Sequence, residues 1–213
     1  MIDLDALLAS FPRRVALFPL RAVVLFPGAL LPLHIFEPRY RTMVADALAG
    51  DGLIAMALLK PCTADEYDTA PPFHETVCLG RVVRHEPLPD GRSNIALFGL
   101  AAGLARAVED DRPYRTVELA PRVDPSVPDA GTFRARLERA FARTLPGAGT
   151  LDDLRARLEG LVGADRLPTA LVNNCAFAAG LLPLDKLRLL EEPDPGRRLD
   201  LLLESLERDW QWN

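Results

Sequence analysis

The chain has 213 residues, of which 49% are hydrophobic and 26% are charged, a composition that excludes an intrinsically disordered protein and allows a sizeable core. Its formal net charge is −5, and acidic residues outnumber basic ones both before and after residue 123. Bulk charge therefore gives no support to a nucleic-acid partner.

The first 123 residues read mainly as short strands. Asp90-Gly91 lies between two apolar runs and predicts a hairpin. Six or seven strands at this spacing predict a small barrel or sandwich. The expected strands are Val15–Leu20, Leu30–Phe36, Leu53–Leu59, Val77–His85, Asn94–Leu100, Leu104–Glu109 and Arg115–Leu119, and Lys60–Thr76 is the one long irregular loop between them.

One amphipathic helix interrupts these strands. Glu37 precedes Pro38, a residue favoured at the first helical position, and Gly50 ends the apolar stripe that begins at Tyr40. We expect this helix to cover one opening or face of the barrel.

Two prolines in 122–128 predict a linker, so we expect domains at 1–123 and 124–213. The second domain should be a compact helical bundle. Its predicted helices are the stripe from Phe133 to Thr144, then Leu151–Leu161, Pro168–Leu181 and Leu184–Leu190, and a last helix capped by Asp194.

The chain is expected to be soluble and cytoplasmic. Cys62, Cys78 and Cys175 are odd in number and widely spaced, which favours a reducing compartment over a disulfide framework. The first residues have no signal-peptide pattern. The long uncharged run near the carboxyl end contains Asn173 and Asn174, which favours a buried bundle helix over a membrane span.

An ordered set of short motifs resembles the Lon protease amino-terminal domain, also called the LON substrate-binding domain. The set comprises Leu17-Phe18-Pro19-Leu20, Leu25-Phe26-Pro27-Gly28, Leu31-Pro32-Leu33, the segment His34–Tyr40, the Asp90-Gly91 hairpin, and Glu192-Pro193-Asp194 with Arg198-Leu199. The resemblance implies an α+β fold, with a PUA-like β pseudo-barrel followed by a helical lobe, as in the short, stand-alone members.

The resemblance also implies a non-catalytic module that recognises polypeptides. Members that degrade proteins continue into an ATPase and a serine–lysine protease. This sequence ends at Asn213 and contains no GxxxxGK[ST] phosphate loop. We therefore expect no enzyme activity, no cofactor and no metal. The expected partners are unfolded or short-lived polypeptides and a separate protease, and neither a membrane nor nucleic acid is expected.

Candidate polypeptide-binding residues cluster near the first helix: Phe26, Leu31, His34, Phe36, Glu37, Arg39 and Tyr40. Structural roles are the alternative for each. The aromatic and aliphatic residues suit a core, His34 suits a hydrogen bond at the strand–helix corner, and Glu37 suits a helix cap. In that interpretation Arg39 or Arg41 pairs with a carboxylate across the barrel mouth.

Two other functions stay open. A small-ligand hydrolase or sensor would bring His34 and Glu37 together in an open pocket. RNA binding would use a barrel of this kind, while Arg136, Arg139 and Arg143 on one helix face read by default as solvated. Metal binding at His74-Glu75 or His85-Glu86 is not expected. The sequence leaves undecided whether Trp210 and Trp212 pack on the bundle or anchor a partner.

Overall fold

The computed structural model describes residues 4–9, 11, 13–69, 71–127 and 131–210. The chain divides into two compact units, one formed by Leu4–Arg122 and one that begins at Val123. The second unit thus begins one residue before the domain boundary expected at residue 124. Each unit is described by itself.

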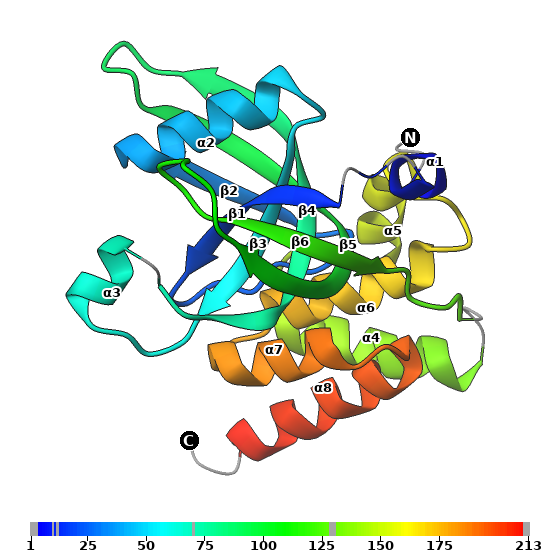
Figure 1. The fold of residues 1–213 in the computed structure, drawn as a ribbon. Coiled ribbons are helices and arrows are strands. Elements are labelled where there is room, and N and C mark those ends of the chain that lie inside the picture. The colour runs from blue at the N-terminus through cyan, green and yellow to red at the C-terminus, as the bar shows by residue number, and fades with distance from the viewer. Residues whose placement is uncertain (1–3, 10, 12, 70, 128–130, 211–213) are drawn as a thin grey trace. The chain divides into compact units, whose positions relative to one another are not determined.

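The first unit is built on a closed ring of β-strands (Figure 1). Its strands are β1 (Arg14–Leu20), β2 (Leu30–Ile35), β3 (Leu53–Leu59), β4 (Phe73–Pro87), β5 (Ser93–Val108) and β6 (Thr116–Arg122). The sheet order β2-β5-β4-β3-β1-β6, with a further pairing of β5 with β6, closes five strands into a barrel. β1 and β3 are parallel, and every other pair is antiparallel. The helices of the second unit complete the α+β class, which confirms the predicted fold class.

β5 is a single long strand with two partners on one edge. Its first half pairs with β2, and its second half pairs with β6. The prediction of two separate strands, Asn94–Leu100 and Leu104–Glu109, is therefore wrong. Gly103 lies in the supposed break, residues 101–103, where the strand continues and the backbone of β6 packs against it: a Cβ at residue 103 would lie 2.9 Å from the Pro121 Cα.

The predicted hairpin joins β4 to β5. Gly91 has a φ of 80°, a backbone conformation that glycine adopts without strain. The Gly91 N–H donates to the Leu88 carbonyl, and the Leu88 N–H donates to the Arg92 carbonyl. The turn residues therefore fix the register of the longest antiparallel pair in the sheet.

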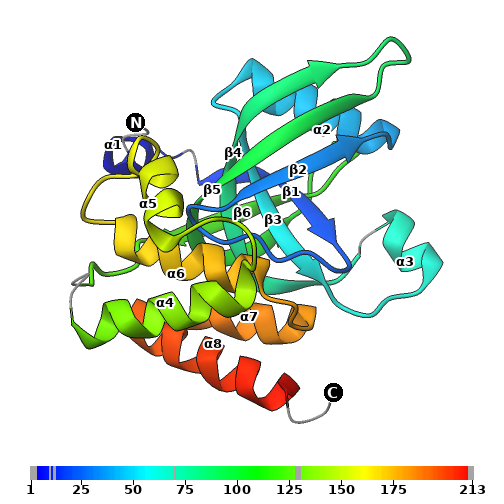
Figure 2. The same cartoon turned by 180° about the vertical axis from the view of Figure 1, so that it is seen from behind.

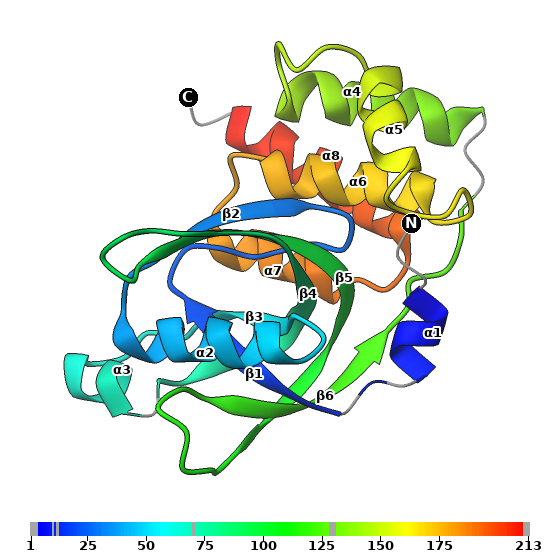
Figure 3. The ribbon, with the colours of Figure 1, turned by 90° about the horizontal axis from the view of Figure 1, so that it is seen from above.

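The first unit contains three helices among its described residues: α1 (Leu4–Ala9), α2 (Pro38–Ala49) and α3 (Ala64–Thr69). α2 is the predicted helix, and it buries Tyr40, Met43 and Val44. Figure 3 shows it lying beside β1 and β3, where the Tyr40 and Phe18 ring centroids are 4.4 Å apart. The expectation of one helix was incomplete, because α3 forms inside the segment predicted to be irregular.

The core of this unit lies inside the ring. Every residue of β3 is buried, as its uninterrupted apolar run predicts. The neighbouring strands β1 and β4 contribute continuous buried runs at residues 17–19 and 76–80, and the segment before β2 adds Val24, Leu25 and Phe26. Burial of these side chains is the main driving force for closing the barrel.

The second unit consists of helices α4 (Thr132–Thr144), α5 (Leu151–Glu159), α6 (Leu167–Ala178), α7 (Pro183–Glu191) and α8 (Pro195–Trp210) (Figure 2). α6 contacts each of the other four, and most of its residues are buried. This arrangement confirms that the apolar run with Asn173 is a bundle helix. No described helix is both long enough and apolar enough to cross a membrane.

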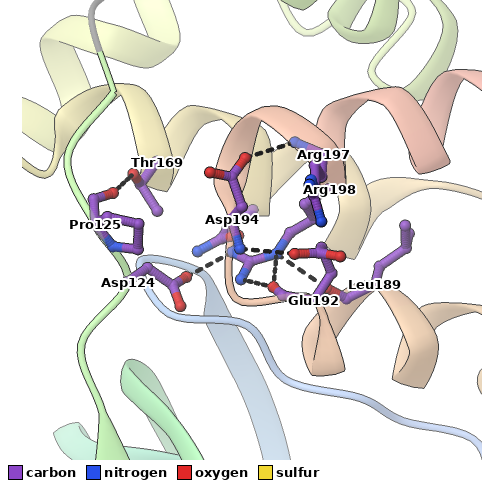
Figure 4. A network of polar contacts seen from close by, with 9 residues as sticks. Asp124, Pro125, Thr169, Leu189, Glu192, Asp194, Arg197 and Arg198 are labelled. Atoms are coloured by element: carbon purple, nitrogen blue, oxygen red, sulfur yellow. Dashed lines mark hydrogen bonds and ion pairs between the residues drawn. The ribbon is translucent and has the colours of Figure 1, made fainter.

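A buried arginine joins the linker to this bundle (Figure 4). The Arg198 side chain on α8 is 0% exposed, and its Nη1 donates to Asp124 Oδ2 at 2.6 Å and to the Asn173 side chain. Its Nε donates to the Leu189 carbonyl at 2.9 Å, and its Nη2 donates to the Glu192 carbonyl. One guanidinium thus fixes the start of the unit, α6 and the α7–α8 corner.

Two arginines on α4 also bind α8, contrary to the solvated face expected of them. Arg136 donates to the Gly196 carbonyl and pairs with Asp200. Arg143 donates to the Leu206 carbonyl. Only Arg139 of the three arginines is without such a bond to α8 among the described contacts, and it is exposed.

Candidate functional site

The seven candidate residues separate into core and surface groups. Phe26, Leu31 and Tyr40 are buried in the first unit. His34 and Phe36 are exposed, and Glu37 and Arg39 are intermediate. The surface group lies at the corner where β2 ends and α2 begins, which we call the β2–α2 corner (residues 34–39).

Phe36 is the most prominent apolar side chain at this corner. It is 58% exposed, and its ring stacks on the His34 imidazole with a centroid separation of 6.2 Å. An aromatic ring held at the surface beside a strand end is typical of a residue that contacts a partner.

The contacts of Arg39 stabilise the β2–α2 corner. Its guanidinium lies 4.7 Å from the ring centroids of both Tyr40 and Tyr67. It pairs with Glu37, with Nη2 to Oε2 at 2.9 Å, and its Nη1 donates to the Tyr67 carbonyl at 3.0 Å. Burial raises the pKa of Tyr40 well above its usual range, so the ring stays neutral beside Arg39. The corner is thereby held rigid by charge-assisted and cation–π contacts.

Glu37 does not have the predicted role of helix cap. It occupies the N-cap position of α2, but its side chain accepts no hydrogen bond from the helix backbone. Instead its carboxylate accepts from Arg39, two residues away, and from the Tyr67 hydroxyl at 3.3 Å. Of the two arginines considered for a pair across the barrel mouth, Arg39 and Arg41, Arg39 forms this local pair instead.

His34 and Glu37 have separate partners. His34 Nδ1 donates to Asn94 Oδ1 at 2.8 Å, and its Nε2 lies 3.5 Å from Arg92 Nη1. Glu37 is engaged by Arg39 and Tyr67. These contacts do not pair His34 with Glu37, as acid–base catalysis by a hydrolase would require. The hydrogen bond of His34 at the corner matches the structural alternative for this residue.

Tyr67 is the residue of this site that sequence reasoning missed. It lies on α3, where the Glu66 carboxylate accepts from the Thr63 N–H and the Glu66 N–H donates to the Thr63 hydroxyl. Arg21 also lies against the Tyr67 ring, 4.9 Å from its centroid. The T-x-x-E spacing of Thr63 and Glu66 is a capping-box signal that could have revealed α3 and its single aromatic residue.

One cavity lies in the second unit, between α4 and α5. Its volume is about 440 Å³, and Phe141, Leu151 and Arg134 are among its lining residues. Arg134 donates to Glu138 and, at 2.7 Å, to Asp152 across the cavity. None of the seven candidate residues lines it.

The other features noted in the sequence are the potential metal ligands, the cysteines and the two tryptophans near the carboxyl end. Within the described ranges, no group of three or more His, Cys, Asp or Glu side chains is placed to hold a metal ion. Cys62, Cys78 and Cys175 form no disulfide, and Cys78 and Cys175 are buried. The question raised for Trp210 and Trp212 concerns side chains that lie outside the described part of the chain.

Comparison with known proteins identifies the family. Residues 14–208 match the model of the ATP-dependent protease La (LON) substrate-binding domain. The Lon protease of Geobacter metallireducens is 32% identical over 202 residues, which cover 94% of this chain and 24% of that protein. The Lon protease of Trichlorobacter lovleyi is 27% identical, over 93% of this chain and 24% of that protein. The chain thus spans about a quarter of the length of these relatives.

Two solved structures share the fold. A Lon N-terminal domain protein from Xanthomonas campestris matches 90% of this chain and 97% of its own, with a TM-score of 0.57 and 24% identity. The N-terminal domain of the Mycobacterium avium complex Lon protease matches 91% of this chain and 98% of its own, with a TM-score of 0.61 and 15% identity. The family match and the Geobacter relative together show that this chain belongs to the family of LON substrate-binding domains.

Proposed function

We propose that this protein is a non-catalytic module that binds unfolded or short-lived polypeptides and presents them to a protease. The matching family is a substrate-binding domain, and the matching relatives are named Lon proteases. Within this chain, the observation that supports the proposal best is the exposed Phe36 ring on a corner that Arg39 makes rigid.

Rigidity and exposure together suit this role. A rigid apolar anchor loses little conformational entropy when a client covers it, so most of its burial contributes to affinity. Most of the large apolar side chains of a client are buried in its native state and become available when it unfolds. The same anchor would therefore discriminate between unfolded and native forms of one polypeptide.

The proposal is tested by fluorescence anisotropy. The probe is a fluorescein-labelled polypeptide kept unfolded by reduction and carboxymethylation of its cysteines, and the control is the same polypeptide with its native disulfides. We expect binding of the unfolded form only. Equal binding of both forms, or of neither, would contradict the proposal.

The corner is tested by substitution of Phe36. Replacing Phe36 with Ala should weaken binding about tenfold, which corresponds to about 1.4 kcal/mol. The matched control is Leu104→Ala, because Leu104 is 61% exposed on the half of β5 that pairs with β6 rather than β2. The control should bind within about twofold of the wild type. If both variants bind alike, the anchor does not lie at this corner.

A further inference from the structure

β2 ends the sheet and has one partner. It pairs with β5 through residues 30–35, and no other strand adjoins it in the sheet order. Figure 2 shows β2 beside β5 at the border of the sheet. Its second edge therefore carries backbone groups that the sheet does not use.

The alternation of backbone hydrogen bonds along the β2–β5 pair identifies those groups. The Gly99 N–H donates to the Ala29 carbonyl, and Ala29 continues the β2–β5 register, in which Leu30 faces Phe98. In an antiparallel pair the bonds alternate, so Leu31, Leu33 and Ile35 are directed to β5. Leu30, Pro32 and His34 are then directed to the open edge.

The hydrogen bonds of the described residues agree with this assignment. None of the backbone bonds outside the sheet ladders uses the N–H of Leu30 or His34, or the carbonyls of Leu30, Pro32 and His34. Pro32 lies at an edge-directed position, where its missing N–H removes no bond to β5. The open edge therefore presents the N–H groups of Leu30 and His34 and the carbonyls of Leu30, Pro32 and His34.

A stripe of side chains borders this edge on one face. Leu30 is 51% exposed, Pro32 and His34 are exposed, and Phe36 follows at the same two-residue spacing. Because an added strand places its side chains directly beside those of its neighbour, this stripe would contact alternate residues of the added strand. Apolar residues at those positions would pack on Leu30 and Phe36.

We propose that an extended segment of the client polypeptide adds as a strand to the open edge of β2, with its apolar side chains at alternate positions against Leu30 and Phe36. An extended main chain is the occupant that presents both N–H and carbonyl groups at a two-residue period. Main-chain bonds carry no sequence information, which suits a module that accepts many clients. This inference rests on the proposed function and specifies its binding mode.

The first test replaces His34. Because its N–H is directed to the open edge, His34→Pro removes a donor from that edge without removing a bond to β5. His34→Val is the matched control, since it also removes the imidazole but keeps the N–H. We expect His34→Pro to weaken binding of the carboxymethylated polypeptide about tenfold and His34→Val to leave it within about twofold. Equal binding by the two variants would overturn strand addition.

The second test changes the probe and leaves the protein intact. The probe is a fluorescein-labelled ten-residue peptide in which Val alternates with Ser between terminal lysines. Two derivatives carry backbone N-methyl groups, one on the Val residues and the other on the Ser residues. Strand addition places one set of N–H groups toward β2 and the other toward solvent, so one derivative should lose binding at least about tenfold and the other should retain it. Equal affinities of the two derivatives would overturn the inference even if His34→Pro failed to fold.

The outcomes separate this inference from the proposed function. If the wild type and His34→Pro bind the unfolded polypeptide equally, the recognition role stands and strand addition is wrong. If the wild type does not bind the unfolded polypeptide, the proposed function itself fails. A wild-type dimer that His34→Pro converts to a monomer in sedimentation equilibrium would make a second copy of this chain the occupant, and would also overturn the inference.

Discussion

Replacement of Arg198 should strongly destabilise the helical unit. The Arg198→Met substitution keeps the long apolar stem but removes every donor of the guanidinium. Asp124, whose side chain is 6% exposed, then loses its ion pair with Arg198. The carbonyls of Leu189 and Glu192 lose their side-chain donors at the same time.

The expected loss follows from breaking one side of a buried ion pair, which costs about 3–5 kcal/mol because the remaining charge stays desolvated. Urea unfolding followed by circular dichroism at 222 nm measures it. With a denaturant slope of about 2 kcal/mol per molar, the midpoint should fall by roughly 2 M.

Two controls make the comparison specific. Arg197→Met changes the adjacent, exposed arginine of the same helix and should alter the free energy of unfolding by no more than about 0.5 kcal/mol. The double variant Asp124→Leu with Arg198→Met should recover part of the loss, because it removes both charges. The reasoning is refuted if Arg198→Met lies within about 1 kcal/mol of Arg197→Met.

Two further predictions concern close packing and thiol burial. Gly99→Ala should destabilise the barrel by about 3 kcal/mol, since the added methyl meets the backbone of Phe26, whereas Gly180→Ala, with nothing near its added methyl, should change the thermal midpoint little. Comparable thermal midpoints of the two variants would show that the segment around Phe26 moves to accommodate the added methyl. Native protein should show one fast thiol toward a disulfide reagent at pH 8, Cys62, and the denatured protein three, because Cys78 and Cys175 are buried and burial raises the pKa of Cys175 to about 11. A second fast thiol in the native protein would contradict that burial.

The fold was predictable where one local signal decided the structure. The continuous apolar run of β3 and the Asp90-Gly91 turn gave correct elements because burial and turn geometry act locally there. β5 was divided in error at residues 101–103, where glycine reads as a break in isolation, whereas Gly103 accommodates the backbone of β6. The packing of another backbone segment against this glycine is a tertiary contact, which the local sequence does not encode.

The sequence singled out the candidate residues but did not predict their contacts. The segment around Phe36 and Arg39 stood out because charged residues interrupt an apolar stretch. Arg39 donates to the carbonyl of Tyr67, which lies about thirty positions away on a helix of six residues. Phe26 and Tyr40 could not be assigned to core or surface from sequence, since apolar residues serve both.

The strand order has a consequence for the kinetics of folding. β1 lies between β3 and β6, so Arg14 at the start of the sheet pairs opposite Glu118 near its end. Such contacts, about a hundred residues apart in the chain, require closure of a long loop before they contribute any stability, and they slow folding into the range of milliseconds to seconds. The β4–β5 hairpin can form early, but a nascent chain cannot close the ring until β6 has left the ribosome. The barrel is therefore assembled after, and not during, synthesis of its own strands.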